Sequence, residues 1–176
     1  MIKPIFILSF IFNVSIFSGN IKDLAETYLN KTLGEDIIIE VDKFVIPKNL
    51  KQKIEIEVKQ RFYTEFIYIY TLKKNREVIG YALLDNVLGK VQPITFLVLY
   101  DKSFNVTKVK VLKYREEYGG EVTNDNWTEQ FKGKNKNSNF KIGEDIDGIS
   151  GATISAKSIA NGVKKLTLLI INLFNE

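Results

Sequence analysis

The sequence predicts an α+β fold: an antiparallel meander sheet with packed helices and a long C-terminal helix. Three observations lead to this prediction. Four successive β-branched and aromatic runs, joined by short polar links, indicate neighbouring antiparallel strands. Apolar residues before and after these runs recur at helical spacing. The 176 residues, of which 45% are hydrophobic, are enough for one domain with its own core.

The N-terminal part of the chain supplies two expected helices and a short strand. The first helix is expected over residues 21–33, where apolar residues recur at helical spacing: Ile21, Leu24, Ala25, Tyr28 and Leu29. Gly34 ends this helix. A short strand over residues 37–41 follows. Pro47 then opens a second helix over residues 48–60, because a first helical turn tolerates proline.

The sheet is expected to contain four strands, over residues 64–72, 78–84, 94–100 and 106–113. Links 73–77 and 101–105 are short and polar, as hairpin loops are. After the sheet, residues 123–131 are expected to form one or two helical turns, and the lysine-rich residues 132–141 a solvated loop. The last helix, over residues 155–174, is apolar almost all round in its final turns, which predicts burial against the sheet.

The composition excludes several classes of chemistry. The chain has no cysteine and no histidine, which removes thiol nucleophiles, zinc ribbons, iron–sulfur clusters, histidine-ligated metals and histidine-dependent catalytic triads. The net charge of +4 is too small to indicate nucleic-acid binding. What remains is carboxylate, hydroxyl, lysine or tyrosine chemistry, or the chemistry of a cofactor.

Residues 1–19 have the layout of a secretory signal peptide. Lys3 precedes an apolar run over residues 5–17, and cleavage is expected near Ser18-Gly19-Asn20. The alternative is an uncleaved anchor, although the run is shorter than the roughly 20 residues that span a bilayer. We therefore expect an exported protein of the periplasm or cell envelope, membrane-anchored if the signal is not cleaved.

The segment over residues 147–155 is the main candidate site. Its small residues leave backbone N–H groups open to approach, and the helix N-terminus behind them attracts anions. The hydroxyls of Ser150, Thr153 and Ser155 can cap that helix or bond phosphate oxygens. The segment therefore suits a phosphate group, or serves only as a capping loop. It lacks the lysine of a P-loop and the spacing of a dinucleotide fingerprint.

The letters SGATIS at residues 150–155, preceded by Asp147, resemble the flavinylation motif of FMN-binding domains. This family includes the flavoprotein subunits of sodium-pumping quinone reductase and of a related ion-translocating electron-transport complex. In the family, a dedicated flavin transferase uses FAD to attach FMN, through its phosphate, to the threonine that follows Gly-Ala. The resemblance implies that this residue is Thr153.

The resemblance extends over roughly residues 80–165. Three stretches resemble the central strands of the family: residues 80–85, 89–90 and 93–98. Residues 114–122, YREEYGGEV, match the form found in small stand-alone members, and residues 131–134 match a recurring Phe-x-Gly-Lys turn. The implied organisation is an FMN-binding core over residues 80–176, with residues 20–79 as an N-terminal extension of the same domain.

The resemblance also implies roles for the loop residues. Asp147 would help the transferase to recognise or orient the loop, and Ser150, Gly151 and Ala152 would be small so that the loop can enter its active site. The helix end at Ser155 would stabilise the phosphate. Because the chain has no histidine to activate a hydroxyl, the catalytic base and metal would belong to the transferase.

Contacts to the isoalloxazine ring are expected from six residues: Thr95, Phe96, Tyr114, Arg115, Glu116 and Trp127. For Trp127 the alternative is a core aromatic residue, since a single tryptophan is usually part of the packing. For Glu116 and Glu117 the alternative is a solvated pair. Gly119 and Gly120 would let the backbone turn tightly or approach the flavin closely.

The leading hypothesis is an exported electron carrier with covalent FMN, matured by a flavin transferase and served by a membrane-bound or envelope redox partner. It would not be an enzyme, although reductase activity stays open. One alternative is a module that binds FMN or another anion non-covalently, without redox turnover. Another is a carboxylate hydrolase built on Asp145 with Asp147, or Glu116 with Glu117. Residues 145–148 also resemble the start of a calcium loop but lack the rest of its pattern.

Overall fold

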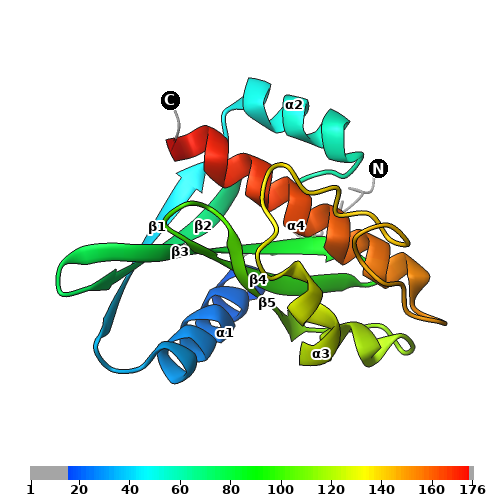
Figure 1. The fold of residues 1–176 in the computed structure, drawn as a ribbon, viewed down its shortest axis with the longest axis horizontal. Coiled ribbons are helices and arrows are strands. Elements are labelled where there is room, and N and C mark those ends of the chain that lie inside the picture. The colour runs from blue at the N-terminus through cyan, green and yellow to red at the C-terminus, as the bar shows by residue number, and fades with distance from the viewer. Residues whose placement is uncertain (1–15, 175–176) are drawn as a thin grey trace, which may run out of the picture.

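The computed structural model describes residues 16–174, with side chains from residue 21 onward. Its five strands form one antiparallel sheet in the order β1-β2-β3-β4-β5, so sequential neighbours pair. The strands are β1 (Ile37–Val45), β2 (Phe66–Lys74), β3 (Glu77–Leu88), β4 (Pro93–Asp101) and β5 (Val106–Lys113). This arrangement confirms the predicted α+β fold (Figure 1). Most of the expected signal peptide lies outside the described residues, so its cleavage stays a prediction.

Helices α1 (Ile16–Leu33) and α4 (Thr153–Phe174) pack on the sheet, and α2 (Lys48–Val58) packs against α4. Short helical turns fill the stretch between β5 and the lysine-rich loop: η1 (Gly120–Thr123), α3 (Asp125–Thr128) and η2 (Glu129–Phe131). β1 is longer than the expected strand and pairs with β2 along its whole length. Within residues 16–174, no helix is both long enough and apolar enough to cross a membrane.

Strands β3 and β4 are buried on both faces of the sheet. On one face, Leu83 and Val98 belong to the core that includes buried residues of α2 and α4. On the other face, Leu84 and Leu97 belong to a second core, which α1 covers (Figure 1). Burial on both faces explains why β4 is apolar along nearly its whole length instead of alternating. The predicted packing of the last helix against the sheet is confirmed by its contacts with β3 and β4.

Helix α4 begins at Thr153, two residues before the predicted start at residue 155. The backbone N–H of Ala156 donates to the carbonyl oxygen of Ala152 at 2.9 Å, which makes Thr153 the first helical residue. The predicted start was late because Thr153 and Ile154 are β-branched, and such residues are weak helix formers. The correction places the hydroxyl of Thr153 at the positive end of a helix of 22 residues.

A buried ion pair fixes α4 on the sheet. The ammonium of Lys165 on α4 lies 2.9 Å from the carboxylate of Asp85 on β3, and Lys165 is 0% exposed. The same ammonium donates to the carbonyl oxygen of Arg61 at 2.8 Å and lies 4.5 Å from the ring centroid of Phe62. The connection between α2 and β2 is therefore tied to α4 as well, and this holds the long helix in register with the sheet.

Candidate functional site

A cavity of about 760 Å³ lies at the N-terminal end of α4. Three segments line it: residues 90–92 at the tip of the β3–β4 hairpin, residues 115–118 after β5, and residues 151–155. This volume lies within the roughly 300–1,000 Å³ typical of small-molecule sites. The cavity therefore brings together three parts of the chain that are far apart in the sequence.

Thr153 lies in the wall of this cavity and is exposed. The preceding Ala152 is buried, and Gly151 has a φ of 78°, a conformation that favours glycine. No atom lies within 4 Å of the position that a Cβ on Gly151 would occupy, so the chain is open on this side. The N–H groups of the first helical turn have no acceptor within the helix, and they give this end its anion affinity.

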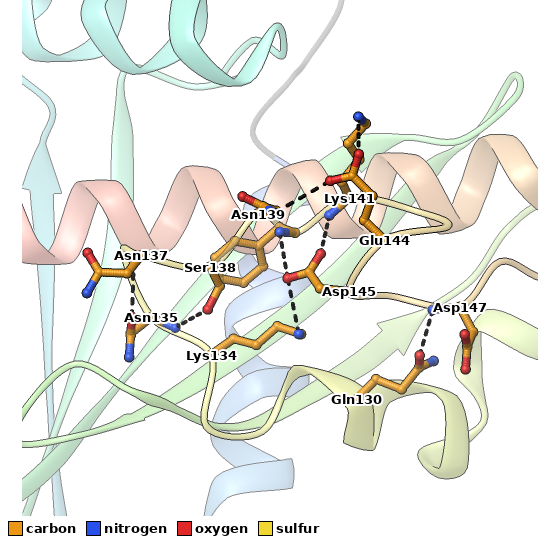
Figure 2. Close-up of polar contacts among 11 residues, drawn as sticks. Gln130, Lys134, Asn135, Asn137, Ser138, Asn139, Lys141, Glu144, Asp145 and Asp147 are labelled. Carbon is orange, nitrogen blue, oxygen red and sulfur yellow. Dashed lines mark hydrogen bonds and ion pairs between the residues drawn. The ribbon is translucent and has the colours of Figure 1, made fainter.

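The loop before α4 is held by its backbone at Asp147. The indole Nε1–H of Trp127 donates to the carbonyl oxygen of Asp147 at 2.8 Å. The N–H of Asp147 donates to Oε1 of Gln130 at 2.7 Å, as Figure 2 shows. Asp147 is an exposed residue. Its backbone is therefore hydrogen-bonded within the protein while its carboxylate faces solvent.

Asp145 organises the lysine-rich loop instead of forming a catalytic pair with Asp147. Its carboxylate accepts hydrogen bonds from the N–H groups of Phe140 and Lys141 and lies 3.2 Å from the ammonium of Lys134 (Figure 2). Partial burial acts to raise the pKa of the Asp145 carboxyl. The hydrogen bonds from Lys141 and Phe140 and the Lys134 ammonium lower this pKa by more than burial raises it, so the net shift is downward. The described residues contain no group of three acidic, histidine or cysteine side chains suited to a metal ion.

The segment after β5 packs tightly against the start of α4. The hydroxyl of Tyr114 donates to the carbonyl oxygen of Tyr118 at 2.5 Å and lies 3.2 Å from the hydroxyl of Ser155. Gly119 has a φ of 82°, and a Cβ there would lie 2.9 Å from the Cβ of Ala152 and from the Tyr114 hydroxyl. The expected tight turn is therefore present at Gly119, and it brings the cavity wall against the loop that carries Thr153.

Glu116 lines the cavity and also holds the hairpin tip. Its Oε1 accepts hydrogen bonds from the N–H groups of Val91 at 2.8 Å and Gln92 at 3.0 Å. These bonds, from Gln92 and then Val91, lower the pKa of the Glu116 carboxyl. A Cβ on Gly89 would lie 2.5 Å from the same carboxylate oxygen, so the hairpin and Glu116 are closely fitted. Glu116 and Glu117 therefore differ in their surroundings: the Glu116 carboxylate is bonded to backbone N–H groups, whereas Glu117 is exposed.

We expect Glu116→Gln to destabilise the protein at neutral pH and to have less effect in acid. Because the pKa of Glu116 is lowered on folding, its contribution is present above the ordinary glutamate pKa of about 4.3 and is lost as the pH falls through the folded-state value. Urea unfolding at neutral pH and near pH 3 measures the gap between wild type and variant. Glu117→Gln, a change at the exposed neighbour, is the control. A gap of equal size at both pH values would refute the role of the charge.

Arg115 supplies a fixed cation to the cavity wall. Its Nη1 donates to the carbonyl oxygen of Pro93 at 2.8 Å and to the hydroxyl of Thr95 at 3.0 Å. Burial lowers the pKa of the guanidinium, but arginine stays protonated at physiological pH. Thr95 is fully buried and also donates to Oδ1 of Asn86 at 2.7 Å. Thr95 is not among the residues that line the cavity, and its link to the cavity wall is the hydrogen bond from Arg115.

The structure brings together some of the expected site residues and separates others. The cavity wall contains Arg115, Glu116, Gly151, Ala152, Thr153 and Ser155. Tyr114, Ser150 and Asp147 do not line it: Tyr114 reaches the wall through the hydroxyl of Ser155, and Ser150 and Asp147 are exposed. Phe96 is fully buried, and its ring fills the space next to Gly162 of α4, so the expected contact of Phe96 with a flavin is wrong. Trp127 is a core residue in edge contact with Phe131, as its alternative interpretation predicts.

Three apolar residues in the cavity wall were missed from the sequence. Val91 is 68% exposed, Tyr118 78% and Ile154 53%. Each is a single apolar residue in a turn or at a helix start, so no periodic pattern marks it. Exposed large apolar side chains that converge on one cavity indicate a ligand or partner site.

The residues of the cavity fit FMN. Its phosphate would meet the first-turn N–H groups of α4 and the hydroxyl of Thr153, with the Arg115 guanidinium in the same cavity. Its ring system would meet the apolar surfaces of Val91, Tyr118 and Ile154. The cavity therefore provides both features that such a ligand needs: an anion-binding site for the phosphate and an apolar surface for the planar ring.

Comparison with known proteins agrees with this fit. The family model described as "FMN-binding domain" matches residues 89–167, which contain β4, β5 and most of α4. The chain is also similar to a subunit of the Na(+)-translocating ferredoxin:NAD(+) oxidoreductase complex of Acetobacterium woodii. The two sequences are 24% identical over 162 residues, which cover 84% of this chain and 76% of the relative. Residues 89–167 thus match the FMN-binding domain family, and both comparisons support FMN as the cofactor.

Proposed function

We propose that this protein is an electron-transfer flavoprotein whose FMN is attached, through its phosphate, to Thr153 by a separate flavin transferase. The observation that carries the proposal is the placement of Thr153. Thr153 is exposed, it is the first residue of α4, and it lies in the wall of the cavity that fits FMN. A residue with only a capping role would not need to open onto a cavity of this size.

The proposed attachment replaces the phosphoanhydride bond of FAD by a phosphate ester to Thr153. The oxygen of Thr153 would form a bond to the flavin-side phosphorus of FAD, the pyrophosphate P–O bond would break, and AMP would leave. The hydroxyl proton would pass to a base of the transferase, because this chain contains no histidine to accept it. The resulting diester carries one negative charge, which the first turn of α4 and the Arg115 guanidinium are placed to stabilise.

The bound FMN would supply one- and two-electron redox chemistry, and the protein would hold it at an open surface. The exposed side chains of Val91, Tyr118 and Ile154 surround the cavity, where a partner can approach closely. We propose a membrane-bound or envelope redox partner, in keeping with the relative, which belongs to an oxidoreductase complex. The expected signal peptide supports a location in the periplasm or cell envelope, with an anchor if it is not cleaved. An electron carrier fits these features better than an enzyme.

Intact-mass measurement tests the proposal directly. The protein is produced with and without a co-expressed flavin transferase that modifies a known substrate in the same cells. We expect a mass increase equal to FMN less one water only with the transferase, and peptide sequencing should place it at Thr153. An unmodified mass beside a modified control substrate would refute covalent attachment. FMN that is then released by denaturation would favour the alternative, a non-covalent FMN-binding module.

A further inference from the structure

We infer that Trp127 and Gln130 hold the acceptor loop, residues 147–152, in the shape that the flavin transferase recognises, so that the transferase acts on the folded domain. The inference rests on the proposed function, because it concerns the same attachment reaction. It assigns Trp127 and Gln130 as positioning residues, which never touch FMN or the reacting atoms. Their hydrogen bonds to this loop go to the backbone of Asp147.

The first step is that both backbone groups of Asp147 are bound. Trp127 donates to its carbonyl oxygen at 2.8 Å. Gln130 accepts from its N–H at 2.7 Å, as Figure 2 shows. Both partners come from the short helical turns α3 and η2, not from the loop or from α4. The entry point of the loop is therefore fixed by a separate part of the domain.

The second step is that the two partners are themselves fixed. Trp127 is buried, and its ring packs edge-on against Phe131 with 5.4 Å between centroids. The side-chain amide of Gln130 donates to the carbonyl oxygen of Trp127 at 3.0 Å, which orients its Oε1 toward the loop. Both side chains are thus already in the bonding position before a transferase arrives.

The third step is that the loop is anchored at its far end and exposed in between. The N–H of Ala152 donates to the carbonyl oxygen of Ile149 at 3.0 Å, and Ala152 is buried at the start of α4. Ser150 and Gly151 are exposed, as is Asp147, whose carboxylate takes no part in holding the loop. The loop therefore presents its hydroxyl and carboxylate groups outward on a main chain that is fixed at both ends.

A loop that is already ordered loses little conformational freedom on binding, whereas a mobile loop has to be ordered by its partner. Removal of one bond to Asp147 should leave the core in place and loosen only the loop entry. A net bond strength of about 1 kcal/mol corresponds to an expected loss of about fivefold in kcat/KM for each bond. The loss should appear mainly as a higher KM for the protein substrate, because the reacting groups on Thr153 and FAD are unchanged.

The test measures initial rates of FMN attachment to the full chain by a purified transferase with FAD, over a range of protein concentrations. Trp127→Phe keeps an aromatic ring in the core but removes the indole donor, and Gln130→Met removes the acceptor at similar length. Gln130→Glu keeps an acceptor oxygen but loses the amide donor to the Trp127 carbonyl oxygen, so it should recover only part of the rate. Tyr100→Phe is the matched control, because it also removes a hydrogen bond of a buried aromatic residue, the one to Thr167 on α4.

A readout without the transferase separates positioning from global stability. Amide hydrogen exchange at Asp147 should become faster in Trp127→Phe and Gln130→Met, while exchange in β3 and β4 stays at the wild-type rate. Wild-type kcat/KM in both variants, or faster attachment than in wild type, would overturn the inference while attachment to wild type upholds the proposed function. If wild type itself is not modified, the proposed function and this inference are both refuted.

Discussion

Replacement of Thr153 by alanine is expected to abolish covalent FMN and to leave the domain folded. The hydroxyl of Thr153 is the proposed attachment atom, and the residue is exposed at the first position of α4, where its side chain supports no core packing. Alanine also has the higher helix propensity, so the helix start should not be weakened. Intact mass after co-expression with a transferase measures attachment, and thermal unfolding measures the fold.

Two variants serve as controls for this prediction. Thr153→Ser keeps a hydroxyl in place and should still accept FMN, whereas Ser103→Ala, which removes an exposed hydroxyl outside the loop and the cavity, should leave attachment at Thr153 unaffected. Ser155 offers no alternative acceptor, because it is buried and its hydroxyl lies 3.2 Å from that of Tyr114. Covalent FMN on Thr153→Ala would therefore assign the attachment to another residue and disprove the proposed role.

The sequence predicted local features well because they depend on neighbouring residues. The strands over 94–100 and 106–113 follow from β-branched runs, and the structure has β4 (Pro93–Asp101) and β5 (Val106–Lys113) there. The turn between β2 and β3 is tighter than the polar link suggested, because Asn75 and Arg76 both take a positive φ, as a two-residue turn of type I′ requires. Even the acceptor loop was visible, since a run of small and hydroxyl residues before a helix is a local pattern.

The surroundings of that loop could not be predicted in the same way. The cavity depends on Val91 at a hairpin tip, Tyr118 after β5 and Ile154 on α4, which only the folded sheet brings together. The partners of Asp147 are Trp127 and Gln130, in a stretch where the sequence predicts only one or two helical turns. Neither the cavity nor these contacts leave a signature in spacing or composition, because both arise from tertiary packing.

Lys165 shows the same limit for charge. In the sequence it follows Lys164 in a helix with a polar face, which is the usual pattern of a solvated lysine. In the structure Lys165 is fully buried because Asp85, on β3, faces α4 and pairs with its ammonium at 2.9 Å. The sequence signal for this pair is Asp85 itself, because an aspartate within an apolar strand indicates a buried cationic partner on the element that packs against it.

Lys165→Met is therefore expected to lower the free energy of unfolding by about 3–5 kcal/mol, the usual cost of breaking a buried pair from one side. The change leaves the nearly buried Asp85 carboxylate without its cation and removes the bond to the carbonyl oxygen of Arg61. Lys164→Met, at the half-buried neighbour, should stay within about 0.5 kcal/mol of wild type. Urea unfolding at neutral pH measures both.

The double variant Lys165→Met/Asp85→Leu separates the charge from the packing. Replacement of a whole buried pair by apolar residues is often close to neutral, so the double variant should recover most of the stability that Lys165→Met loses. If it does, the single variant is unstable because a carboxylate is left unpaired, not because methionine fits poorly among the residues of α2 and β3. If the double variant is as unstable as the single one, the bond of Lys165 to Arg61 and its contact with Phe62 carry the stability, and the ion pair does not.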